Sequence, residues 1–272
     1  MSPSAAETRA VAALRAHIER GAHEHYDDAL YYDHVDKRRR EDVNFYVQMA
    51  KQWGGPILEL GVGTGRVAAA IAAEGIEITG VDAHPAMLQQ AEARQKGLPL
   101  AKRKLMRLKL GDIRELRLRR RFRLVIAPFN VLMHLYDHDD LHRALRSAHR
   151  HLEARGRFAF DVLMPDLRSF LRAPERRYRC RDIFVPALGR RYAYYESFRY
   201  DSVRQIQIVR MDFVSEDHAF TRYLSQRQFF PQELEAACHR ARFRLEERWG
   251  DFAGSPPDID SPSQVLVLGV ER

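Results

Sequence analysis

The chain has 272 residues, of which 45% are hydrophobic and 10% aromatic, enough for a packed core in one large or two small domains. No apolar run approaches the roughly 20 residues that a membrane helix needs. The N-terminus also carries acids and arginines where a signal peptide has its apolar core. We therefore expect a cytoplasmic protein with no membrane partner.

The net charge of +8 raises the question of a nucleic-acid partner, because clustered Lys and Arg release counterions from phosphates. The densest basic run, residues 102–123, spreads over an expected strand, a loop and the start of the next strand. Arginine is also favoured over lysine almost everywhere in the chain. We interpret the run as a solvated basic face and expect no specific nucleic-acid partner.

Metal and disulfide chemistry find little support in the residue spacing. Cys180 and Cys238 stand far apart, and neither has a His or Cys at ligand spacing beside it. His149 and His151 face opposite sides of an expected helix. We expect no metal site, and both cysteines to be small apolar residues.

Residues 26 to about 52 form a tyrosine-rich segment that we expect to be helical. We expect this segment to cap the carboxyl edge of the sheet that follows. From residue 56 to about 162, apolar strands alternate with amphipathic helices, a pattern typical of a parallel sheet flanked by helices. The expected strands are 56–60, 76–81, 104–110, 122–128 and 156–162, with helices at 64–73, 85–96 and 139–152.

The pattern changes after residue 162. Aromatic and β-branched stretches between residues 178 and 230 predict an antiparallel insertion of three or four strands. One helix and two strands, in "PQELEAACHRA", "FRLEERWGDF" and "SQVLVLGVER", then close the chain.

Residues 57–67, "ILELGVGTGRV", place three alternate glycines directly after an apolar run that contains Glu59. Glycines between a strand and a helix let the backbone turn sharply and approach a ligand, and the helix N-terminus offers free N–H groups. The nicotinamide fingerprint G-x-G-x-x-G fails, because its third glycine would fall on Arg66.

Two carboxylates follow the next two expected strands. Asp82 ends the strand in "ITGVDAHPAML", where it can accept both hydroxyls of a ribose. Asp112, in "LGDIREL", ends the third strand where the exocyclic amine of adenine would lie. The glycines and the two acids therefore converge on one crevice at the carboxyl ends of successive strands.

With these motifs the chain resembles the class I S-adenosylmethionine-dependent methyltransferases, from about Tyr26 to Glu271. The long strand insertion resembles the small-molecule branch that includes glycine and aminosugar N-methyltransferases. The resemblance implies an α/β, Rossmann-like seven-stranded sheet whose last strand is antiparallel. It also implies a helical cap at 1–50, a methyltransferase domain at 51–272 and a substrate lid at about 164–228.

The resemblance implies S-adenosylmethionine as cofactor and S-adenosylhomocysteine as product. In such enzymes the glycine loop holds the methionine end, one acid takes the ribose and another holds adenine. Tyr32 and Arg39, the latter in the "KRRRED" run, are the nearest equivalents of residues that reach the cofactor carboxylate. The implied cofactor residues are Tyr32, Arg39, Glu59, Gly61, Gly63, Gly65, Asp82, Ala83, Met87, Asp112, Ile113 and Asn130.

Methyl transfer needs an aimed nucleophile and the removal of a proton. Asn130 and His134 follow the fourth expected strand, where they would border the transferring methyl. His134 titrates in a range suited to a base, or is a packed structural residue. Alternate residues in "RYAYYESFRY" share a face, so Tyr194, Glu196 and Phe198 either line the acceptor pocket or belong to ordinary cross-strand packing.

The predicted function is methyl transfer to an N or O nucleophile of a small-molecule acceptor. A nucleic-acid (RNA) methyltransferase is one alternative, although "APFN" after the fourth strand departs from the base-methylation motif. A protein that binds S-adenosylmethionine without catalysis is the other alternative, although the glycine loop and both acids are intact. We expect any homodimer to form through the strand insertion.

Overall fold

The computed structural model of the chain describes residues 5–37 and 39–271. The chain divides into two compact units. One combines Met1–Val35 with Asp166–Gln228, and the other combines Asp36–Pro165 with Phe229–Arg272. The domain boundaries that the sequence suggests, at residue 50 and at about 164 and 228, stay predictions.

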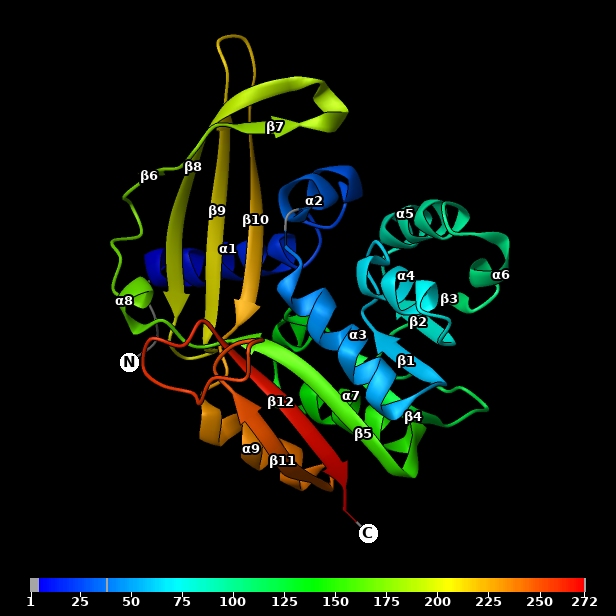
Figure 1. The fold of residues 1–272 in the computed structure, drawn as a ribbon. Coiled ribbons are helices and arrows are strands. Elements are labelled where there is room, and N and C mark those ends of the chain that lie inside the picture. Colours follow the sequence, from blue (N-terminus) through cyan, green and yellow to red (C-terminus); the bar gives the residue numbers. More distant parts are fainter. Residues whose placement is uncertain (1–4, 38, 272) are drawn as a thin grey trace. The chain divides into compact units, whose positions relative to one another are not determined.

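The second unit is built on a sheet with the strand order β11-β12-β5-β4-β1-β2-β3 in the described chain (Figure 1). β12 is antiparallel to both of its neighbours, whereas β5, β4, β1, β2 and β3 pair in parallel. The predicted Rossmann-like sheet with an antiparallel last strand is therefore confirmed. The strands are β1 (Ile57–Leu60), β2 (Ile78–Asp82), β3 (Met106–Leu110), β4 (Phe122–Ala127), β5 (Leu152–Leu163), β11 (Phe243–Trp249) and β12 (Ser263–Val270).

Helices cover both faces of this sheet, so its central strands are buried on both sides. One apolar cluster joins the sheet to α3 (Glu41–Trp53), α4 (Arg66–Ala73) and α5 (Pro85–Lys96). A second cluster joins the sheet to α7 (His138–His151) and α9 (Pro231–Arg240). α3 packs against α4 and β4, so it lies on a face of the sheet rather than across its carboxyl edge.

The alternation of strands and helices is confirmed, with shifted ends. α5 begins at Pro85 and ends at Lys96, as expected. α4 begins at Arg66 rather than at residue 64, because Gly65 is left-handed and cannot continue a right-handed helix. β5 begins at Leu152, whose backbone pairs with Phe122 ahead of a register shift. Short elements at α6 (Leu100–Arg103) and η1 (Val131–His134) complete this part of the unit.

The first unit contains the expected antiparallel insertion. Its long strands β8 (Arg190–Asp201), β9 (Ile206–Val214) and β10 (Ala219–Arg227) form a meander, and two short strands, β6 (Tyr178–Arg179) and β7 (Ile183–Val185), pair with β8. α1 (Ala5–Gly21) packs on β9 and β10, where the Ser225 hydroxyl donates to the Ile18 carbonyl at 2.7 Å. α2 (Ala29–Asp36) places Tyr31 in an aromatic cluster on the sheet. α8 (Leu167–Phe170) and η2 (Pro186–Leu188) are single turns.

Within the part of the chain that the structure describes, no helix is long and apolar enough to cross a membrane. Cys238 is buried in the second unit, and Cys180 is half-buried in the first.

Candidate cofactor and methyl-transfer site

The three glycines between β1 and α4 are all left-handed, with φ of +66° at Gly61, +54° at Gly63 and +76° at Gly65. A Cβ at Gly61 would lie 2.5 Å from a methyl of Val131, and one at Gly65 would lie 2.8 Å from the Met106 methyl. A Cβ at Gly63 would meet nothing within 4 Å. Packing therefore excludes side chains at Gly61 and Gly65, whereas Gly63 turns towards open space that a ligand can occupy.

Asp82 holds this loop from the end of β2. One carboxylate oxygen accepts the N–H of Gly63 at 2.7 Å, and the other accepts the N–H of His84 at 2.9 Å. The side chain is buried, and this burial raises its pKa, while the two N–H donors favour the charged form. Each oxygen keeps a further lone pair, so the carboxylate can still accept ribose hydroxyls.

Glu59 lies beneath the loop, in the middle of buried β1. Only 2% of the residue is exposed, and burial raises the pKa of its carboxyl well above the ordinary value. The nearby Arg66 guanidinium opposes this shift, and the charge of Asp82 adds to it. The protein therefore encloses the Glu59 side chain, and its role in cofactor binding stays a prediction.

An ion pair beside the loop, between Arg66 and Asp42, was missed in the sequence. Arg66, the first residue of α4, forms a two-pronged ion pair with the fully buried Asp42, with N–O distances of 2.9 and 2.6 Å. Arg39 lies 3.7 Å from the same carboxylate, and its guanidinium stacks 4.5 Å from the Phe129 ring. The structure thus brings Arg39 to the end of β4, close to the predicted site. Residue 38 of the same basic run lies outside the described residues.

The signal for this ion pair was Arg66 itself. It occupies the place where a nicotinamide fingerprint has its third glycine, and a long cation at the first turn of a helix needs a compensating acid. Asp42 lies 24 residues earlier in the chain, and no local pattern marks it as that acid.

The other predicted cofactor residues follow β2 and β3. Asp112 is the second residue after β3, but its carboxylate is already paired with the Arg114 guanidinium, whose hydrogen bonds hold the Asp112 pKa below its usual range. Ala83 is exposed, and Ile113 packs against the core. Met87 is 1% exposed, so the protein itself covers the side chain expected to pack on adenine. The adenine contacts stay predictions.

Asn130 and His134 lie in the turn after β4, as predicted. Asn130 is buried and left-handed, with φ of +64°, and it precedes η1, which ends at His134. His134 is half-buried, with its ring edge-on to Tyr136 at 6.5 Å between centroids. The position agrees with the expectation, whereas a role as base stays a prediction.

A buried acid behind this turn was also missed. Asp161, in β5, is 1% exposed and accepts hydrogen bonds from the N–H of Phe129, the N–H of Asn130 and the hydroxyl of Tyr46. The only signal in the sequence was an acid inside the apolar strand "GRFAFDV". Tyr46 carried no signal, because it lies 115 residues away in α3.

The remaining predicted residues belong to the first unit. Tyr32, on α2, lies in an aromatic group with Tyr26 and His25. On β8 the Tyr194 hydroxyl donates to the Glu196 carboxylate at 2.7 Å, and the pKa of Tyr194 is raised by burial and by this charge.

Phe198, two residues further along β8, lies on the same face of the strand. The Arg172 guanidinium covers its ring at 4.5 Å from the centroid. Tyr194, Glu196 and Phe198 therefore share a face, as alternation predicted, and their role in acceptor binding stays a prediction.

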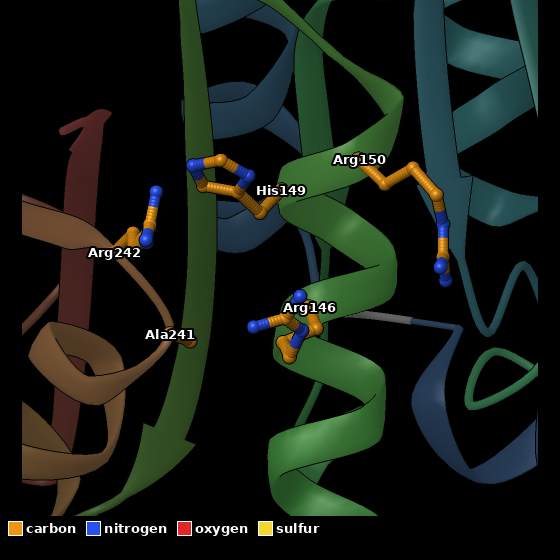
Figure 2. Close-up of a pocket in the computed structure, with 5 residues that line it drawn as sticks. All are labelled: Arg146, His149, Arg150, Ala241 and Arg242. Carbon is orange, nitrogen blue, oxygen red and sulfur yellow. The ribbon is translucent and has the colours of Figure 1, made fainter. Parts of the chain in front are cut away.

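A cavity of about 370 Å³ lies elsewhere in the second unit, between the last turns of α7 and the turn after α9 (Figure 2). None of the predicted site residues lines it. His149 and Arg146 project from α7 on the side of Arg242, whereas Arg150 extends along the other side of the helix. Its lining is Arg146, His149, Arg150, Ala241 and Arg242.

Comparison with known proteins agrees with this geometry. A family described as "Methyltransferase domain" matches residues 57–156, which hold the glycine loop, both acids and the turn after β4. No curated protein sequence matches the chain significantly.

Among solved structures, the CcbJ methyltransferase from Streptomyces caelestis is 26% identical, with a TM-score of 0.77 over 91% of this chain and 98% of its own. The glycopeptide N-methyltransferase MtfA is 21% identical, with a TM-score of 0.60 over 85% and 90%. CalS10, an amino pentose methyltransferase from Micromonospora echinaspora, is 19% identical, with a TM-score of 0.61 over 87% and 94%.

The fold, the glycine loop and these matches together define the class of protein. Residues 57–156 are a methyltransferase domain. The chain that carries it is an S-adenosylmethionine-dependent methyltransferase, as the sequence motifs predicted.

Proposed function

We propose that this enzyme transfers the methyl group of S-adenosylmethionine to an amine nitrogen or a hydroxyl oxygen of a small-molecule acceptor. The observation that carries the cofactor site is the open side of Gly63 next to the buried Asp82 carboxylate. The small-molecule acceptor is supported by two solved methyltransferases that match this chain over most of its length. MtfA and CalS10, which are named for a glycopeptide and an amino pentose, match 85% and 87% of this chain.

The residues present fit the cofactor. Gly63 offers an open surface and a left-handed backbone that lets a ligand approach closely. Asp82 keeps lone pairs for the ribose hydroxyls, and Arg39 offers a guanidinium for a carboxylate. Asp112 shares its carboxylate with Arg114, so a contact to adenine would use its remaining lone pairs.

The chemistry asks the protein mainly for positioning. When bound, S-adenosylmethionine supplies a methyl group on a positively charged sulfur. An acceptor lone pair would take this methyl group, the electrons of the broken carbon–sulfur bond would stay on sulfur, and the methylated nitrogen or oxygen would have a proton to lose. We propose that His134 accepts that proton and that Asn130 borders the transferring methyl group.

The Tyr194–Glu196 pair is our proposal for the acceptor residues. A carboxylate that accepts a bond from a buried tyrosine, on a strand face rich in aromatic rings, suits a cationic amine. The Arg172 guanidinium over the ring of Phe198 illustrates that this face accommodates a cation.

The proposal is tested by supplying methyl-labelled S-adenosylmethionine with two kinds of acceptor, amine- and hydroxyl-bearing small molecules on one side and RNA or duplex DNA on the other. Mass spectrometry identifies the methylated product. We expect a labelled small molecule. Glu196→Gln should raise the KM for an amine acceptor about 10-fold, which is on the order of 1.4 kcal/mol, with the KM for the cofactor unchanged.

The exposed Glu216→Gln, in the same unit, is the matched control and should leave both constants unchanged. Label in RNA or DNA with none in small molecules would favour the nucleic-acid alternative, particularly if neutralising Arg119 and Arg121 abolished it. Cofactor binding without any methylated product from small-molecule extracts would favour the non-catalytic alternative.

A further inference from the structure

The turn after β4 contains two consecutive non-glycine residues in the left-handed region. Phe129 has φ of +62° and Asn130 has φ of +64°. Asn tolerates this conformation, but a bulky aromatic residue adopts it rarely and under strain. Such a turn persists only where its surroundings hold it.

One carboxylate holds both strained residues. Asp161 accepts the N–H of Phe129 on one oxygen, at 2.8 Å, and the N–H of Asn130 on the other, at 3.3 Å. The hydroxyl of Tyr46 donates to the first oxygen at 2.6 Å. Because the carboxylate is 1% exposed, no bulk water competes for these donors.

The same turn is in contact with the cofactor loop. A methyl of Val131, the next residue, lies 2.5 Å from where a Cβ of Gly61 would be. The Phe129 ring carries the guanidinium of Arg39 at 4.5 Å and that of Arg66 at 5.4 Å. A change in the turn would therefore move groups that contact Gly61, the first glycine of the loop, and Arg66, the residue directly after its last glycine.

We infer that Asp161 is a positioning residue for methyl transfer, which holds the Phe129–Asn130 turn in the strained conformation that sets Val131 against the glycine loop. The inference rests on the proposed function, because that loop is the proposed cofactor site. Asp161 acts through the turn and touches no reacting atom.

Asp161→Asn tests this directly. It preserves the size of the side chain but replaces one accepting oxygen with an NH₂ group, which cannot accept an N–H. We expect the Kd for S-adenosylhomocysteine to rise about 10-fold or more, as measured by calorimetry. Amide hydrogen exchange in residues 128–133 of the ligand-free protein should also become faster.

Tyr46→Phe is the matched control. It removes one hydrogen bond to the same buried carboxylate but leaves both bonds to the turn, so it should lower the melting temperature while the Kd and the exchange rates stay close to wild type. A second comparison uses Phe129→Gly, because glycine adopts positive φ without strain. In that background Asp161→Asn should change the Kd no more than about twofold.

An Asp161→Asn variant with wild-type Kd and wild-type exchange, and only a lowered melting temperature, would make Asp161 an ordinary core residue. If that variant does not fold, the two Phe129→Gly proteins decide, and a 10-fold loss between them would contradict the inference. A wild-type protein that does not bind S-adenosylhomocysteine would refute the proposed function, whereas hydrogen exchange would still report on the turn.

Discussion

At the scale of single residues, three of the buried carboxyl groups near the proposed cofactor site differ in their partners. Asp82 accepts two backbone N–H groups, Asp161 accepts three donors, and Glu59 has one oxygen without a hydrogen bond from the described residues. Burial raises the pKa of all three. The donors to Asp82 and Asp161 include backbone N–H groups of the glycine loop and of the turn after β4, so these two carboxylates fix the backbone geometry there.

In the proposed mechanism, His134 accepts the proton that the acceptor loses. If it accepts the acceptor's proton, His134→Ala should lower turnover about 100-fold or more, with the Kd for the cofactor nearly unchanged. If it only packs beside Tyr136, the melting temperature should fall instead. Full turnover with a lowered melting temperature would show that His134 is a packed structural residue. Positioning of the acceptor would then remain as the main mechanism.

Residues whose signals are local were predictable from the sequence. Gly61, Gly63 and Gly65 are spaced along one turn, and Asp82 ends an apolar strand, so their place in the structure follows from neighbours within a few residues. Asp161 could be seen only as an acid in an apolar strand, and its three donors come from distant segments.

At the scale of elements, α2 and the turn before it contain a histidine with an unusual environment. The ring of His25 lies among Tyr26, Tyr31 and Tyr32, at 5.2 to 6.2 Å between centroids. Loss of solvent, aided by the charge of Arg222, lowers the pKa of His25 to about 4. The folded protein therefore keeps this ring neutral at pH values where the unfolded chain protonates it.

This shift predicts a loss of stability in acid. Above about pH 6.5 the ring is neutral in both states, and between about pH 6.5 and 4 only the unfolded chain gains the proton, so folding weakens as the pH falls. By pH 5 the loss should be about 2 kcal/mol. His25→Phe removes the titrating ring, so chemical denaturation at pH 8 and pH 5 should show a correspondingly smaller loss for the variant. Equal losses in both proteins would remove His25 from the account.

Element ends depended on backbone geometry that composition does not reveal. The left-handed Gly65 delays the start of α4, and the pairing of Leu152 with Phe122 starts β5 early. α3 was predicted as a helix, but its place on a face of the sheet depends on Asp42 and Tyr46, whose partners Arg66 and Asp161 are remote in the sequence.

At the scale of the whole molecule, ion pairs within the second unit neutralise part of the positive charge of the basic run at residues 102–123. Arg120 forms a two-pronged pair with Glu77 at 2.6 and 2.7 Å, and Arg114 pairs with Asp112 and Asp140. These pairs favour the interpretation of the run as a solvated face. The net charge of the chain does not by itself define a nucleic-acid-binding surface.

A matched pair of glycines tests most directly whether the open side of Gly63 receives the cofactor. Gly63 and Gly189 have similar φ, +54° and +63°, and a Cβ at either would meet nothing within 4 Å. Gly63→Ala and Gly189→Ala should therefore cost similar stability, on the order of 1 kcal/mol. Calorimetric titration with S-adenosylhomocysteine should show a Kd raised about 10-fold or more for Gly63→Ala and unchanged for Gly189→Ala. Wild-type affinity in Gly63→Ala would contradict the account.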